Sequence, residues 1–199
     1  MKLLSLLSVA TIAAIMTGCA SYSTPAMKKT AEMKPMAGEN PMVGGAAMFA
    51  SKNIIENAVN SKDHTTLVAA VKAAGLVETL QGPGPFTVFA PVNSAFDALP
   101  PGAVANLLKP ENKTALTKVL TCHVVGASAM STAIKGMIAD DNGVHPVKTL
   151  GGCVLKASYK GDKILLTDEN GRISTVTIAD VKQSNGVIHV VDTVILPKQ

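Results

Sequence analysis

The residues that could carry chemistry are few and lie far apart in this chain. Its four histidines never stand at the His-x-x-x-His spacing that places two zinc ligands on one helix face. No serine lies in a Gly-x-Ser-x-Gly motif, and no phosphate-binding glycine loop precedes an expected helix. The paired carboxylates at 140–141 and 168–169 fall in expected turns, where contact with water leaves no means of tuning them for acid–base catalysis. We therefore expect no catalytic residue, no cofactor, no metal site and no enzymatic activity.

Two histidines lie within apolar segments and are candidates for a buried role. His123 follows an expected helix, and His189 stands between Ile188 and Val190 in an expected strand. A buried imidazole usually stays neutral and hydrogen-bonds the backbone, so we predict a structural role for both, with partner binding as the alternative. Asp192 could pair with His189 only if the chain bends, because strand residues three apart point to opposite faces.

Cys122 and Cys153 remain as a pair if Cys19 serves another purpose. In an oxidising compartment, an even number of cysteines predicts a disulfide. Each of the two lies in an expected strand, and the strands of one small sheet can bring α-carbons within bridging distance. The bridge would close a loop of about thirty residues and stabilise the fold by about 3 to 4 kcal/mol. The alternative is two separately buried thiols.

Residues 1–18 have the pattern of an export signal. Lys2 gives a positive start, and residues 3–16 form an apolar run too short for a permanent membrane helix. The run ends in Met-Thr-Gly followed by Cys19, which resembles a bacterial lipobox and predicts a lipid on that cysteine. Ala20 follows the cysteine in place of the aspartate that signals inner-membrane retention, which favours the outer membrane. The alternative is ordinary cleavage after Ala20, and both interpretations predict an exported protein.

Residues 19–47 are expected to form a flexible tether. They are rich in Ser, Thr, Pro, Lys and Gly and lack apolar periodicity, so they cannot offset the entropy of ordering. Five methionines mark the tether and its end, and thioethers suit Cu(I), so a copper-scavenging segment is the alternative to a plain spacer. These methionines are Met27, Met33, Met36, Met42 and Met48.

The charge distribution argues against nucleic-acid binding. The chain has 18 basic and 14 acidic residues, and removal of Lys2 with the signal leaves a net charge of 17 − 14 = +3. Arg172 is the sole arginine, and aromatic residues make up only 3% of the chain, so bases would find little to stack on.

The remaining residues, 48–199, predict one α+β domain whose first half is rich in helices and whose second half is rich in strands. Asp63 and Gly75 are expected to cap the second helix. The expected helices are 53–59, 63–74, 76–80, 103–108, 112–120 and 131–138, and the expected strands after the first are 122–125, 145–149, 153–158, 163–167, 172–178 and 187–196.

Two segments have a distinctive pattern. In residues 85–96, alternating apolar residues through Phe89 predict a strand that Pro91 ends, because proline has no N–H for a ladder. Asn93 is then placed to cap the helical turn that carries Phe96 inward. In residues 185–197, Asn185 and Gly186 predict a turn before a long apolar strand that contains His189 and Asp192.

Together these two segments resemble the signature motifs of fasciclin domains, and the resemblance extends over about residues 49–198. It implies a β-sheet wedge with helices packed on it. The family's Tyr-His motif is matched only in part, because Cys122 precedes His123 here.

The resemblance also implies adhesion, with a surface protein or a polysaccharide as partner and membrane contact only through the lipid anchor. Two other functions stay open: a module that binds a small apolar or lipid-like molecule, and a periplasmic metal or stress accessory that uses the methionine-rich tether.

Overall fold

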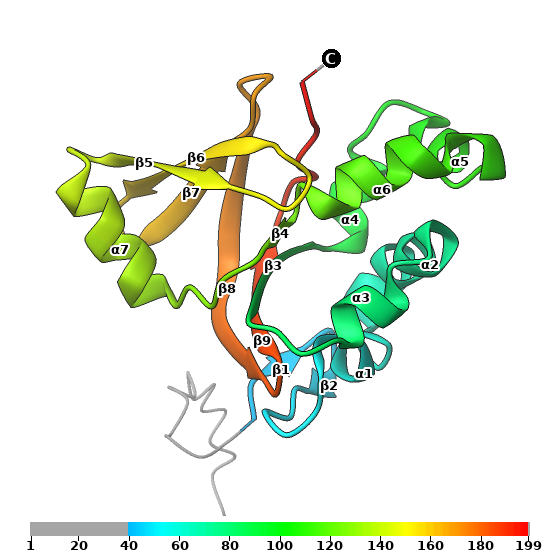
Figure 1. The fold of residues 1–199 in the computed structure, drawn as a ribbon, viewed down its shortest axis with the longest axis horizontal. Helices are drawn as coiled ribbons and strands as arrows, with labels where there is room; N and C mark the ends of the chain where they lie inside the picture. The colour runs from blue at the N-terminus through cyan, green and yellow to red at the C-terminus, as the bar shows by residue number, and fades with distance from the viewer. Residues whose placement is uncertain (1–39, 199) are drawn as a thin grey trace, which may run out of the picture. The chain divides into compact units, whose positions relative to one another are not determined.

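The computed structural model describes residues 40–198, and the predicted export signal, Cys19 and residues 20–39 of the tether lie outside this range. The described chain has the predicted α+β fold, with helices concentrated in its first half and strands in its second. Figure 1 shows helices α1 to α6 on one side of strands β3 and β9, and strands β5 to β7 with helix α7 on the other side of β8.

The main sheet contains seven strands in the order β4-β3-β9-β8-β7-β6-β5. Only the central β3–β9 pair is parallel, and every other neighbouring pair is antiparallel. The strands are β3 (Phe86–Pro91), β4 (Val124–Val125), β5 (Val144–Lys148), β6 (Val154–Lys160), β7 (Lys163–Thr167), β8 (Ile173–Gln183) and β9 (Gly186–Val191).

The helices lie close to the predicted segments. Asn53 caps α1 with Glu56 in a reciprocal capping box, and Gly75 ends α2 in the left-handed conformation with φ 74°. The α-helices are α1 (Ile54–Ala58), α2 (Thr65–Ala74), α3 (Val77–Gln81), α4 (Asn93–Asp97), α5 (Ala103–Leu107), α6 (Lys113–Thr121) and α7 (Ser131–Asp140).

Residues 42–47 correct the predicted boundary of the tether. They form a two-stranded hairpin of β1 (Met42–Val43) and β2 (Ala46–Ala47) that belongs to the fold. Val43 and the following Met48 are 3% and 2% exposed, so the hairpin contributes to the core. Periodicity could not show this, because two-residue strands are too short to have a detectable period.

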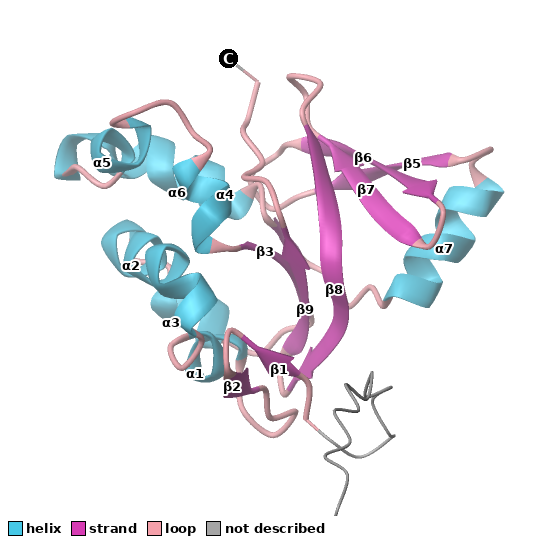
Figure 2. Ribbon diagram, turned by 180° about the vertical axis from the view of Figure 1, so that it is seen from behind, coloured by secondary structure: helices cyan, strands magenta, loops and turns pink. Residues whose placement is uncertain are grey.

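Strand β8 is longer than predicted and curves along the length of the sheet (Figure 2). Its pairing with β9 shifts register twice, between Val176 and Ile178 and between Ile178 and Val181. Asp180 has a positive φ of 61° at the second irregularity. Bulges of this kind bend a strand, and here they let one strand pair first with β7 and then with β9.

Strand β9 is shorter than predicted and ends at Val191. The turn before it also differs from the predicted Asn-Gly turn, because Gln183 pairs with Gly186 and the two turn residues are Ser184 and Asn185. A Cβ at Gly186 would lie 2.1 Å from the Phe86 carbonyl oxygen. The glycine is therefore required where β9 approaches β3, and not by the turn itself.

Replacing Gly186 with alanine is expected to lower the free energy of unfolding by about 1 to 3 kcal/mol, since overpacking here must displace backbone of the central strand pair. Urea unfolding of the Gly186→Ala variant measures the loss. Gly136→Ala is the control, because a Cβ at Gly136 meets no atom within 4 Å and this glycine has the ordinary backbone of helix α7. Equal losses in the two variants would contradict the steric argument.

Two apolar clusters form the core. The larger lies among α1, α2, α3, α6 and the inner residues of β3 and β9, and contains Val88, Ala90, Ile188 and Val190. The second lies between the sheet and α7, and contains Phe89, Ile134, Leu155 and Leu166. Because alternate residues of β3 enter different clusters, the central strand pair is buried on both faces.

Candidate functional site

The residues of the two sequence motifs meet on the central strand pair. Phe89 of β3 is the register partner of His189 of β9, and their rings stack with centroids 5.8 Å apart. Pro91 is paired with Val191 at the end of β3, and Phe96 of α4 is buried in the larger cluster. The two motifs therefore form one contiguous interior region.

His123 is buried and both of its ring nitrogens are engaged. Nδ1 lies 2.8 Å from the Val119 carbonyl oxygen, to which it donates, and Nε2 accepts from the Ile195 backbone N–H at 3.0 Å. This fixes the neutral tautomer with the proton on Nδ1. Burial lowers the pKa of His123 from 6.5 to about 4, while the Val119 carbonyl and the Asp168 carboxylate oppose the shift. The ring therefore joins α6 to the C-terminal segment.

His189 is also buried, but it does not pair with Asp192. Its Nε2 lies 2.8 Å from the Ala129 carbonyl oxygen, and its Nδ1 accepts from the Asp180 backbone N–H at 3.3 Å. Burial lowers the pKa of this imidazole, against the opposing effects of Ala129 and Asp180. Asp192 instead accepts from the Thr175 backbone N–H at 2.8 Å.

The prediction that Asn93 caps its own helix is wrong. Val92 is the N-cap of α4 and gives it no side-chain hydrogen bond. The Asn93 Oδ1 atom accepts from the Thr66 backbone N–H at 3.0 Å, and its Nδ2 donates to the Lys62 carbonyl at 2.8 Å. The side chain therefore caps the start of α2, the helix that Asp63 was expected to cap.

Replacing Asn93 with alanine is expected to lower the free energy of unfolding by about 1 kcal/mol, the usual loss when a helix cap is removed. Asn93→Asp keeps the acceptor for Thr66 and loses only the donor to Lys62, so it should lose less. Urea midpoints of the two variants make the comparison. A larger loss for Asn93→Asp would contradict the capping role.

Asn185 joins three elements at the other end of β9. Its Oδ1 accepts from Ile54 N at the start of α1, at 3.1 Å. Its Nδ2 donates to the carbonyls of Leu80 and Gly82 at the end of α3, at 2.8 and 3.0 Å. The amide thus satisfies backbone groups that both helix ends leave without partners.

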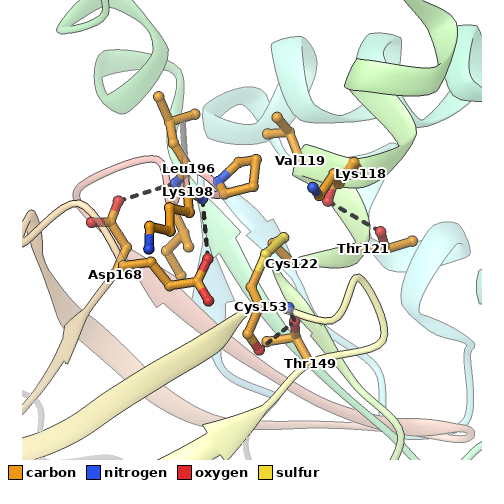
Figure 3. The surroundings of a disulfide bond; sticks show 12 residues. Lys118, Val119, Thr121, Cys122, Thr149, Cys153, Asp168, Leu196 and Lys198 are labelled. Carbon is orange, nitrogen blue, oxygen red and sulfur yellow. Dashed lines mark hydrogen bonds between the residues drawn. A yellow bond between two sulfur atoms is a disulfide. The ribbon is translucent and has the colours of Figure 1, made fainter.

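Cys122 and Cys153 form a disulfide with α-carbons 5.4 Å apart. Neither residue lies in a strand as predicted, because Cys122 is the C-cap of α6 and Cys153 immediately precedes β6. Figure 3 shows the bridge beside the C-terminal segment that Asp168 holds through Leu196. The disulfide thus ties the helical half of the chain to the strand-rich half.

The C-terminal segment after β9 is held by side chains that sequence reasoning did not identify. The buried Asp168 accepts from Leu196 N at 3.2 Å, and Glu169 accepts from Lys198 N at 3.0 Å. The amide Nδ2 of Asn170 donates to the Pro197 carbonyl at 3.0 Å. These partners are 27 to 29 positions apart in sequence, so no local pattern could have shown them.

Asp180 is a further missed residue. Its Oδ1 accepts from the Ser131 backbone N–H at 2.6 Å, and its other oxygen accepts from the Ser131 hydroxyl, so the bulged β8 caps the start of α7. The signal would have been an aspartate within a run rich in β-branched residues, because aspartate is depleted in regular strands and is typical there of a bulge or a functional residue.

An apolar cavity of about 40 Å³ lies between the sheet and α1 to α3. A cavity of roughly 150 Å³ accepts benzene, so this one has no room for a lipid chain. Among residues 40–198, no three His, Cys, Asp or Glu side chains gather in a way that could hold a metal ion. In the same part of the chain, no helix has the length and apolarity to cross a bilayer.

The fold defines a class of α+β domain in which the polar side chains of the sequence motifs hydrogen-bond backbone groups and so join the sheet to the helices. Residues 62–197 match the fasciclin domain family, and the chain belongs to that family.

Relatives with this domain include surface proteins. The chain is 45% identical to protein sll1483 of Synechocystis sp. over 80% of its own length and 81% of that protein. It is 30% identical to the cell surface glycolipoprotein MPB83 of Mycobacterium bovis, over 90% of this chain and 70% of that one. It is 37% identical to the transforming growth factor-beta-induced protein ig-h3 of Sus scrofa, over 66% of this chain but only 17% of that longer protein.

A solved structure supports the fold. A fasciclin domain pair from the insect cell adhesion molecule fasciclin I superposes with a TM-score of 0.65 at 16% identity, over 73% of this chain and 51% of that one. At this identity the likeness concerns the fold alone.

Proposed function

We propose that the protein is exported, anchored to the outer membrane through a lipid on Cys19, and mediates adhesion through weak contacts with a surface protein or a polysaccharide. The periplasm and the medium are the other locations that the sequence allows. Many anchored copies would raise the effective concentration, so each single contact can be weak. In this proposal the domain has no enzymatic activity.

One observation carries the proposal. The polar motif residues are used within the fold: His123, His189 and Asn185 bond backbone groups of other elements. Because these side chains are engaged within the fold, a partner must bind other residues on the exposed surface, as in an adhesion module. The surface location of the MPB83 glycolipoprotein agrees with this.

The test measures attachment of cells that lack the protein. We expect reduced aggregation or surface attachment, restored by the wild-type chain and not by a Cys19→Ala variant, which cannot be lipidated. Adding purified Cys19→Ala protein to wild-type cells should compete for the partner. Periodate or protease treatment of the target surface then separates a polysaccharide from a protein partner. Unchanged attachment in the deletion strain would overturn the proposal.

The two alternative functions receive less support. A lipid-like ligand between the sheet and α1 to α3 meets a cavity of only about 40 Å³, and the cavity of about 180 Å³ between the sheet and α7 has room for no more than a small apolar molecule. For the copper segment, Met48 is 2% exposed in the core and so is withdrawn from the tether, while Met27, Met33 and Met36 lie outside the described residues. Native mass spectrometry of freshly purified protein tests the first alternative, and Cu(I) titration of the full chain tests the second.

A further inference from the structure

The β1–β2 hairpin has two unlike faces. Val43 and Met48, on its inner face, are 3% and 2% exposed. Met42 is opposite Ala47 in the register, so their side chains share the outer face, where Met42 is 61% exposed. A hydrogen bond of 2.9 Å from Met48 N to the Pro41 carbonyl extends the pairing by one position, and Phe49 follows it directly as the first residue of a turn, with 40% of its surface exposed.

The exposure of Phe49 is fixed by the fold. The buried Asn57 accepts from the Phe49 backbone N–H at 3.0 Å and donates to its carbonyl at 2.8 Å. These two bonds hold the backbone in place while the side chain stays 40% exposed. The Lys52 ammonium lies 5.0 Å from the centre of the Phe49 ring. An apolar ring beside a cation is the combination that bilayer interfaces accept, with the ring among acyl chains and the amine at headgroups.

The segment between Cys19 and β1 indicates that the surface next to these exposed side chains is a bilayer. The first described residue, Asn40, is 40 − 19 = 21 positions after the predicted lipid-bearing Cys19 and leads directly into β1. A chain of that length reaches at most about 75 Å even when fully extended. Figure 1 shows β1 and β2 at the end of the described domain away from its C-terminus. In the proposed function, the hairpin is therefore the part of the fold nearest in sequence to the membrane anchor.

We propose that the exposed Met42 of the β1–β2 hairpin, together with Phe49 and Lys52 in the turn that follows the hairpin, rests on the bilayer that carries the lipid anchor. The inference deepens the proposed function and rests on its lipid anchor. Two apolar side chains and one cation are too few to hold a soluble protein, but a tether makes the second contact intramolecular. The contact sets the orientation of the domain, with its C-terminal end and the β7–β8 turn directed away from the membrane and toward a partner.

The chain contains no tryptophan, so one introduced indole reports its own position. Full-length lipidated Phe49→Trp protein is reconstituted in vesicles of phosphatidylglycerol and phosphatidylcholine whose acyl chains are brominated. Bromine quenches an indole that enters the acyl region. Ile173→Trp is the matched control, because Ile173 is 55% exposed at the start of β8. Mass spectrometry of the N-terminal peptide reports the lipid on Cys19 independently, and urea unfolding verifies that both variants fold.

We expect bromine to lower the emission of Phe49→Trp by about twofold or more and to leave Ile173→Trp nearly unchanged. Equal emission changes in the two variants, with Cys19 lipidated, would overturn the membrane contact and leave the anchor standing. A blue shift of Phe49→Trp without bromine quenching would mean that a second copy or another protein covers the face, and would also overturn it. An unmodified Cys19 would overturn the anchor itself and the contact with it.

Discussion

Reduction of the Cys122–Cys153 disulfide is expected to lower the free energy of unfolding by about 3 to 4 kcal/mol. The bridge spans 31 positions, and in the chain-entropy account its loss restores that much conformational freedom to the unfolded chain. The half-cystines are 0% and 2% exposed, so the native fold must open before a reductant reaches them. We therefore expect slow reduction under native conditions and a lower urea midpoint once a thiol assay shows that reduction is complete.

A double variant, Cys122→Ala/Cys153→Ala, separates the bridge from the chemistry of the reductant. Alanine leaves no polar atom in the core, whereas serine would bury a hydroxyl without an assured partner. The double variant should lose about as much stability as the reduced wild type, with an added contribution from the small cavities. Its urea midpoint should not respond to reductant. An unchanged midpoint for fully reduced wild type would contradict a stabilising role for the bridge.

The sequence predicts best what local chemistry determines. Asn53 with Glu56, and Gly75 at the end of α2, act on residues within one turn of themselves, and both helix ends lie where expected. The β3 strand ends at Pro91 because proline lacks a donor, which is again a local property. Such features need no knowledge of which elements become neighbours.

The sequence does not predict a contact in which a residue acts on an element far away along the chain. Asn93 caps α2 across 27 positions, and Asp180 caps α7 across 49. Strand β8 has bulges that break its alternation, so its second half could not be recognised as strand. The role of Gly186 shows the same limit, because the Asn-Gly pair is typical of a turn while the glycine is required by a neighbouring strand.

The motif residues of the candidate site were predictable, whereas its geometry and the contributions of Asp168, Glu169 and Asp180 were not. The motif residues were identified, and a structural role was expected for His123 and His189. His123 accepts from the Ile195 N–H, and Asp168 accepts from the Leu196 N–H. Both bonds require a C-terminal segment that is not paired as a strand. The sequence suggested a strand there, because the apolar run continues beyond Val191.

Acidification is expected to destabilise the fold through His123. Its pKa is about 4 in the fold and 6.5 when unfolded, so between these values the unfolded state binds the extra proton. The stability is therefore complete above pH 6.5, falls as the pH drops, and has lost about 2 kcal/mol at pH 5 and about 3 kcal/mol at pH 4. Protonation of Nε2 would point a second donor at the Ile195 N–H, which breaks the bond to the C-terminal segment. Burial also lowers the pKa of His64 and His189, which adds a loss of the same sign.

Urea unfolding from pH 7 to pH 5 measures the slope, and NMR titration of the imidazole protons assigns it. His123→Phe keeps a ring but leaves the Val119 carbonyl and the Ile195 N–H without partners, so it should be less stable at pH 7 and lose less between pH 7 and pH 5. His145→Gln is the control, because this histidine lies at the surface with its ring 2.6 Å from Asp141, outside the core. A His123 imidazole that titrates near pH 6.5 in the folded protein, or a His123→Phe variant with the wild-type slope, would contradict the prediction.

Because the His123 ring connects α6 to the segment beside the disulfide, its protonation should loosen the C-terminal segment first. This should be seen as faster hydrogen exchange at Ile195 and Leu196 than in β9.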